Sequence, residues 1–160
     1  MQLFDASSVI YAWDNYPIRQ FPGLWGWMAE QIAEKKVVMP TVAFDEVDNK
    51  IPECSAWLRE NHIEQFPVTN AIIQQALLIK HLLGIVGDNY HSKGVGENDI
   101  FIIATASVNN LGLVSDEGRQ PKLPDIPSKR KIPAVCTMEE VGVPCMSFIE
   151  FIKRSEVVFG

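Results

Sequence analysis

The sequence predicts one α/β domain, residues 1–160, built around a parallel sheet. Short apolar segments with strand character alternate with longer segments of helical periodicity along the chain, which is the pattern of consecutive βαβ units. The alternation is clearest over residues 96–117, where a mostly apolar helix leads into a short apolar run that ends in two carboxylates. A chain of 160 residues is long enough to bury one core between a sheet and its helices.

The composition indicates an ordinary globular protein, with 47% apolar and 21% charged residues. The formal net charge is −6, so any contact with nucleic acid must use a local basic patch. Three cysteines without metal-ligand spacing are typical of buried thiols in a reducing compartment. The sequence shows no signal peptide, and no apolar run approaches the roughly 18 residues of a membrane-spanning helix. We therefore expect a cytoplasmic protein without a membrane partner.

The first predicted strand, residues 2–4, ends directly at Asp5. Ser7 or Ser8 is expected to cap the helix that follows, because a hydroxyl can accept from its free amides. An isolated Asp5 would be interpreted as a helix cap itself. Its position at the carboxyl end of a strand favours a functional role, since ligands of parallel sheets bind there.

The second predicted strand, residues 37–39, leads into a helix that Thr41 is expected to cap. Helical spacing allows one carboxylate of this helix to face the end of the first strand. We assign that position to Glu46 rather than to its neighbour Asp45, although periodicity alone does not separate adjacent residues. The alternative is that both are first-turn charges favoured by the helix dipole.

The middle of the chain predicts helices that cover the sheet, over residues 53–61 and 70–83, the second capped by Thr69. The segment between them, residues 63–68, is expected to be an extended connector. A flexible link over residues 84–96 then precedes the helix of the 96–117 stretch and is expected to form a rim of the site.

That stretch carries three more carboxylates at candidate positions. Asp99 lies at the start of its helix, and the helix is expected to end at the Asn109–Asn110 turn. Residues 111–114 form a short apolar strand of the kind that is buried on both faces. Asp116 and Glu117 follow that strand, in the same setting as the acidic residue after the first strand.

Residues 118–131 predict a loop, because they contain three prolines and no periodicity. The loop is basic, and its charge is either solvated surface or a contact for RNA phosphates. The basic residues are Arg119, Lys122, Lys129, Arg130 and Lys131. After it we expect a helix over residues 133–140, a strand over 143–146 and a final helix over 148–156, which Ser147 caps.

The repeated placement of carboxylates at strand ends and helix starts predicts a metal site. Two ionised carboxylates about 4 Å apart repel by on the order of 4 kcal/mol at an effective dielectric constant near 20. A hard divalent cation removes this repulsion, and Mg²⁺ and Mn²⁺ prefer carboxylates together with retained waters. Two such ions can activate a water and stabilise the leaving oxygen of a phosphodiester. The pattern therefore predicts metal-assisted hydrolysis of phosphodiesters, without a nucleophilic serine or cysteine.

Four motifs of the sequence resemble those of the PIN-domain nucleases. They are L-F-D-A-S-S around Asp5, M-P-T-V-A-F-D-E-V around Glu46, N-D-I-F-I-I-A-T-A around Asp99 and L-V-S-D-E ending at Glu117. K-I-P at 131–133 and G-V-x-C at 142–145 are similar to a poorly characterised bacterial and archaeal PIN-like branch. The resemblance implies a three-layer α/β/α sandwich with a central parallel sheet of about five strands.

The same resemblance implies the site residues. The implied catalytic acids are Asp5, Glu46, Asp99 and Glu117, of which all but Glu46 would hold metal. Many PIN domains have T-x-D at the fourth motif, which aligns Ser115 with the threonine and Glu117 with the aspartate. This departure leaves Asp116 as a rival ligand. Ser7 and Ser115 would hydrogen-bond the ligands or a water.

The implied activity is that of a Mg²⁺- or Mn²⁺-dependent endoribonuclease, often the toxin of a toxin–antitoxin pair. The implied partners are an RNA substrate, an antitoxin protein and a second copy of the chain, with the aromatic segment near Trp25 as the dimer surface. A phosphatase of the haloacid-dehalogenase type is disfavoured, because it expects D-x-D where this chain has Asp5-Ala6-Ser7. A catalytically degenerate PIN-like module that binds RNA or a protein partner stays open, because glutamate occupies the fourth position.

Overall fold

The computed structural model describes residues 1–160 and contains a five-stranded, all-parallel sheet. Its strands are β1 (Gln2–Phe4), β2 (Val37–Pro40), β3 (Gln65–Phe66), β4 (Gly112–Val114) and β5 (Cys145–Met146), in the order β3-β2-β1-β4-β5. The chain first builds outwards from β1 through β2 to β3, and then returns to the other side of β1 with β4. The crevice between β1 and β4 is therefore the point where the strand order reverses, the usual ligand site of an open parallel sheet.

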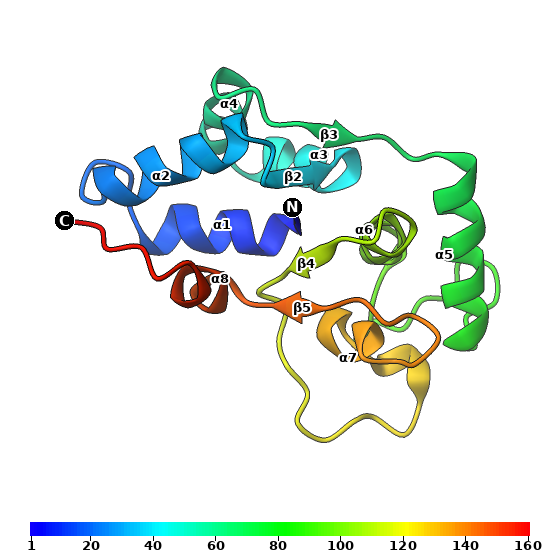
Figure 1. The fold of residues 1–160 in the computed structure, drawn as a ribbon. Coiled ribbons are helices and arrows are strands. Elements are labelled where there is room, and N and C mark those ends of the chain that lie inside the picture. Colours follow the sequence, from blue (N-terminus) through cyan, green and yellow to red (C-terminus); the bar gives the residue numbers. More distant parts are fainter.

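Helices cover both faces of this sheet, which confirms the three-layer α/β/α sandwich. They are α1 (Ala6–Asn15), α2 (Pro22–Ala33), α3 (Thr41–Lys50), α4 (Pro52–Glu60), α5 (Asn70–Leu82), α6 (Glu97–Val108), α7 (Ile132–Cys136) and α8 (Phe148–Ser155). Figure 1 shows α1 and α2 on one side of the sheet and α5, α6 and α7 on the other. None of the helices combines the length and apolar character that crossing a membrane requires.

The three central strands are apolar because the sheet is covered on both faces. Leu3, Val38 and Leu113 lie fully buried at its centre. Their register is direct, since Leu3 pairs with Val38 on one side and with Leu113 on the other. The chain therefore leaves β1 and β4 at the same level of the sheet, and the residues that follow these strands meet.

Trp25 itself belongs to the core, whereas Phe21 of the same aromatic segment is 41% exposed, so the dimer surface expected near Trp25 stays a prediction. Trp25 is only 4% exposed, and its Nε1 donates a 2.7 Å hydrogen bond to the carbonyl oxygen of Tyr16. The rings of Trp13 and Trp57 meet its ring edge-on, with centroids 5.4 and 4.9 Å away. Buried aromatic area of this kind stabilises the packing between helices.

Most predicted elements are present, and the differences have local causes. The expected connector at 63–68 contains β3, a two-residue edge strand. The helix expected over 133–140 ends at Cys136. There the hydroxyl of Thr137 bonds the carbonyl oxygen of Ala134 at 2.7 Å, and the chain turns through Gly142, whose φ is +58°.

The expected caps are confirmed at two of three helices outside the site. Thr69 accepts a hydrogen bond from the Ile72 amide at 3.3 Å, and Ser147 accepts one from the Glu150 amide at 3.2 Å. Thr41 is instead the first residue of α3, which has no side-chain cap. The helix therefore begins directly after Pro40, the last residue of β2.

Candidate active site

Asp5 lies where β1 ends and α1 begins, at the strand-order reversal. It occupies the N-cap position of α1, but its side chain makes no capping hydrogen bond. Its Oδ2 instead accepts hydrogen bonds from Ser7 Oγ at 2.5 Å and from Ser115 Oγ at 3.0 Å. The residue is only 2% exposed. A role as a simple helix cap therefore does not account for Asp5.

The pKa of Asp5 is raised to about 7, mainly because burial disfavours its charged form. The hydroxyls of Ser7 and Ser115 act in the opposite direction, by donating to the carboxylate. The charges of Asp99 and Glu46 raise the pKa further. The two hydroxyls offset only part of the cost of burial, so a cation beside Asp5 would stabilise its charged form further.

Two serine hydroxyls connect the ends of β1 and β4. Ser7 Oγ and Ser115 Oγ lie 3.3 Å apart. Ser7 Oγ also accepts a 2.9 Å hydrogen bond from the amide of Asp116, and Ser115 Oγ accepts a 3.2 Å one from the amide of Glu117. These contacts fix both the orientation of Asp5 and the backbone that carries the last two carboxylates.

Asp116 and Glu117 are adjacent in sequence but have different surroundings. Asp116 Oδ2 accepts hydrogen bonds from Ser8 Oγ at 2.6 Å and from the Phe148 amide at 3.2 Å, so it joins the end of β4 to the starts of α1 and α8. The expectation that Ser7 or Ser8 caps α1 is therefore wrong, because both hydroxyls bond carboxylates instead. Glu117 carries no such structural hydrogen bonds.

Glu46, Asp99 and Glu117 converge on the same region. Burial raises the pKa of each of them, and the charge of Asp99 raises the pKa of both glutamates further. One oxygen of Asp99, Oδ2, accepts a 2.9 Å hydrogen bond from the Gly96 amide at the start of α6. Asp45, the alternative to Glu46, is exposed. The structure thus brings together all four acids that the sequence motifs name.

Asp5, Glu46, Asp116 and Glu117 line an open pocket of about 370 Å³. Asp99 is not part of that lining, but its charge raises the pKa values of Asp5, Glu46 and Glu117. No three His, Cys, Asp or Glu side chains are already grouped so that they could hold a metal ion. The donors are hard oxygens, which suits Mg²⁺ or Mn²⁺, and Mg²⁺ is commonly bound by one or two carboxylates with several waters. The residues fit such an ion by their chemistry, without forming a closed cage.

Two site residues were not identified from the sequence. Lys50, at the end of α3, lines the pocket. Its positive charge lowers the pKa values of Glu46, Asp99 and Glu117, against the effect of burial. Asn98, in the first turn of α6, also lowers the pKa of Glu46 through its side chain. Lys50 follows Glu46 by four residues, and this helical spacing was the available signal.

The basic loop approaches the site at one point only. Arg119 forms an ion pair with Glu150 of α8, and Lys122 is exposed. Lys129 and Arg130 are half-buried beside the link before α6. The charge of Lys131 lowers the pKa of Glu117, against the effect of burial, so this loop residue lies close enough to act on a site carboxylate.

Gln120 holds Lys131 in this place. Its Oε1 accepts a 2.8 Å hydrogen bond from the amide of Lys131, and its Nε2 donates one of 3.1 Å to the carbonyl oxygen of Lys129. A Cβ atom on Gly118 would lie 3.7 Å from Lys131 Nζ. The lysine therefore lies beside the chain that leaves β4.

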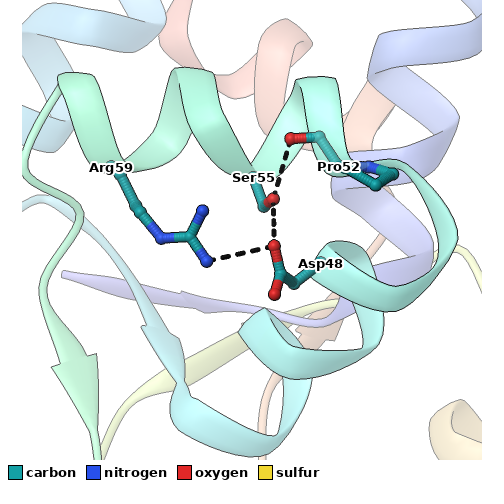
Figure 2. Close-up of polar contacts among 4 residues, drawn as sticks. All are labelled: Asp48, Pro52, Ser55 and Arg59. Carbon is teal, nitrogen blue, oxygen red and sulfur yellow. Dashed lines mark hydrogen bonds and ion pairs between the residues drawn. The ribbon is translucent and has the colours of Figure 1, made fainter.

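The helix that carries Glu46 and Lys50 is fixed at its corner with α4. Figure 2 shows Asp48 Oδ1 accepting hydrogen bonds from Ser55 Oγ at 2.6 Å and from Arg59 Nη2 at 3.0 Å. Ser55 is fully buried, and its hydroxyl is the first cause that lowers the pKa of Asp48. This contact ties α3, which carries both site residues, to α4.

Comparison with known proteins gives the family. Residues 2–159 match the family described as "Domain of unknown function (DUF4411)". A search of curated proteins finds no match.

Solved structures give the fold. VapBC2 from Rickettsia felis, bound to a DNA fragment from their promoter, matches with a TM-score of 0.52 and 16% identity over 81% of this chain and 96% of that chain. FitAcB from Neisseria gonorrhoeae matches with a TM-score of 0.55 and 16% identity, over 93% of this chain and 99% of that chain. These similarities confirm the PIN-like fold that the motifs predict. The chain belongs to the DUF4411 family, and its fold is PIN-like.

Proposed function

We propose that this protein is a metal-dependent endoribonuclease that uses Mg²⁺ or Mn²⁺. One observation carries the proposal: four acids from separate parts of the chain act on one another's charge at the β1–β4 crevice, each with a raised pKa, and three of them line the pocket there. Such a cluster destabilises a metal-free protein, so its presence is best explained by a function that needs it. A divalent cation that binds among the carboxylates relieves their repulsion and stabilises the folded protein.

The residues of the site would have different roles in holding the ion and orienting the water. Asp5, Asp99 and Glu117 would hold the ion, and Glu46 would complete its surroundings or orient the attacking water. When bound, the ion would supply an activated water and neutralise charge on the phosphodiester. Ser7 and Ser115 would keep the Asp5 carboxylate directed at the ion, because both already donate to its Oδ2.

We prefer Glu117 to Asp116 as the fourth acid. One oxygen of Asp116 is engaged with Ser8 and the Phe148 amide, which makes this residue a structural anchor. Glu117 is half-buried beside Asp99 and has a longer side chain that can reach an ion. Lys131 and the other basic residues of the 118–131 loop would contact RNA phosphates.

We place the protein as the toxin-like partner of a small antitoxin protein in the cytoplasm. The PIN-like fold shared with VapBC2 and FitAcB supports this, together with the motif resemblance to PIN toxins. All three cysteines are free, which supports a reducing compartment. A homodimer is part of the same proposal. Its surface would use the exposed part of the aromatic segment near Trp25, such as Phe21, rather than the buried Trp25 ring.

Cleavage of varied single-stranded RNAs, with Mn²⁺ and with EDTA, tests the proposal. We expect cleavage with Mn²⁺, none with EDTA and none by the Asp5→Asn variant. The matched pair Glu46→Gln and Asp45→Asn sharpens the test, since the two acids are neighbours and only Glu46 faces the site. Glu46→Gln should lose cleavage and Asp45→Asn should retain it.

One observation favours a second function, a catalytically degenerate module that binds RNA or a protein partner. No three acidic side chains are already arranged to hold a metal ion. In that case Mn²⁺ would neither promote cleavage nor raise the melting temperature. RNA binding would then persist in EDTA.

A further inference from the structure

Two lysines lie beside the acidic pocket, on the two sides of the β1–β4 crevice. Lys50 ends α3, which follows β2 on one side of β1. Lys131 lies immediately before α7, between β4 and β5 on the other side. Lys50 lines the pocket, and the ammonium group of Lys131 lies beside Gly118, just past Glu117. The positive charges of both lysines lower the pKa of Glu117, which burial raises.

Neither lysine is part of a structural ion pair. The four ion pairs of the protein join Lys35 to Glu64, Lys36 to Glu34, Arg59 to Asp48 and Arg119 to Glu150. Lys50 is exposed although several carboxylates lie near it, and its ammonium group stays more than ion-pair distance from them. A favourable interaction with the C-terminal dipole of α3 explains a basic residue there, but not its position in the pocket lining.

A polyanion cannot cross an acidic pocket unless cations lie where its flanking phosphates rest. A bound divalent ion would offset the carboxylates at the centre only, because charges more than about 8 to 10 Å apart are largely screened. The flanking phosphates therefore need their own partners, and lysines contact phosphate as mobile point charges. Asp5, the most buried of the acids, lies deep in the pocket, which favours a single strand that can bend towards it.

We infer that Lys50 is a phosphate-contacting residue, and that single-stranded RNA crosses the site from Lys50 over the carboxylates to Lys131. This rests on the proposed function and deepens it, by giving the path of the substrate. Lys131 belongs to the basic loop already assigned to RNA, whereas Lys50 is added on the opposite side. The two lysines act on phosphates of one strand that flank the scissile phosphate on either side.

Binding of a fluorescein-labelled oligouridine of about 12 nucleotides tests this path, since single-strand sites cover about 4 to 16 nucleotides. Anisotropy is measured in the cleavage-deficient Asp5→Asn background over a range of salt concentrations. Lys50→Met and Lys131→Met should each weaken binding several-fold and flatten the slope of log K against log salt by about 0.7. The double variant should lose about twice that slope, and Lys50→Arg should retain most of the affinity.

Lys153→Met is the matched control. Lys153 is exposed, has no ion pair and lies in the last turn of α8, as Lys50 lies in the last turn of α3. Its removal should change neither affinity nor slope. Mn²⁺ binding, measured by calorimetry on the otherwise wild-type chain, should not weaken in Lys50→Met, because the lysine opposes cation binding. Melting temperatures are recorded first, and Lys50→Gln replaces Lys50→Met if the latter unfolds.

The outcomes separate the path from the nuclease activity. If wild-type protein cleaves RNA with Mn²⁺ but Lys50→Met cleaves with unchanged kcat/KM, the path is wrong and the nuclease stands. If wild-type protein never cleaves but binds RNA through Lys50 and Lys131, the nuclease is wrong and the path stands. Equal losses in Lys50→Met and Lys153→Met, or no RNA binding by the wild-type chain, overturn the path.

Discussion

Ser115 Oγ donates a 3.0 Å hydrogen bond to Asp5 Oδ2, although 110 positions separate the two residues in the chain. The contact exists because β1 and β4 pair in direct register, with Phe4 opposite Val114, so the next residues of both strands meet. The serine stabilises the charged form of a carboxylate whose burial disfavours it. This contact joins the ends of β1 and β4 at the candidate site.

The stability of the metal-free protein should fall as the pH rises from about 4 to 7. Over this window the folded protein keeps a proton on Asp5, whose pKa is about 7, while the unfolded chain releases it near its ordinary value of 3.8. The difference corresponds to on the order of 4 kcal/mol at pH 7, and the raised pKa values of the other acids act in the same direction. Urea unfolding in EDTA at several pH values measures it.

Asp5→Asn serves as the control for that titration. The variant should be as stable as the wild type, or more stable, at pH 7 without metal, and its stability should depend less on pH. A variant that unfolds would mean that Asp5 is needed for structure rather than for function.

Divalent metal should stabilise the wild-type protein. At a free Mn²⁺ concentration of about 100 times Kd, the free energy of unfolding rises by about 2.7 kcal/mol. The increase in melting temperature should be larger at pH 8 than at pH 6, because protons compete with the ion for Asp5. An equal shift in Asp5→Asn would contradict binding at this site.

Asp116→Asn and Glu117→Gln should have opposite effects. Asp116 accepts from Ser8 and from the Phe148 amide, so its replacement should cost about 1.5 to 3 kcal/mol of stability, as for hydrogen bonds to a charged group. Glu117→Gln should leave stability nearly unchanged and weaken Mn²⁺ binding. Thermal unfolding and calorimetry of both variants check the assignment, and the reverse pattern would make Asp116 the ligand.

Removing the Ser115 hydroxyl should move the pH dependence of metal binding upwards. The hydroxyl lowers the pKa of Asp5, so Ser115→Ala raises that pKa and shifts the midpoint of Mn²⁺ affinity to higher pH. Ser92→Ala, at an exposed position in the link before α6, is the control. If both variants keep the wild-type midpoint, the hydrogen bond does not tune Asp5.

Much of the fold was predictable because its signals are local. Apolar runs of three or four residues identified the central strands, and Thr69 and Ser147 were recognisable as caps from their own neighbourhoods. The two-residue strand β3 was not recognised, since an edge strand of that length has no periodicity to detect. The early end of α7 was missed because helical composition continues beyond Cys136.

The candidate site was predictable only as far as its signals are local in the sequence. The placement of acids after strands pointed to the right edge of the sheet. The roles of Ser8 and Asp116 depend on each other and on the Phe148 amide, which lies 32 positions away from Asp116 in the chain. Lys50 was hidden because a basic residue in a last helical turn is common. Such partners are set by tertiary packing, which local sequence does not encode.

The central claim is that acids from separate elements form one divalent-metal site. Anomalous diffraction from crystals equilibrated with Mn²⁺ tests it most directly. We expect a strong anomalous peak among the carboxylates of Asp5, Asp99 and Glu117. Peaks only elsewhere on the protein, or none at saturating Mn²⁺, would contradict it.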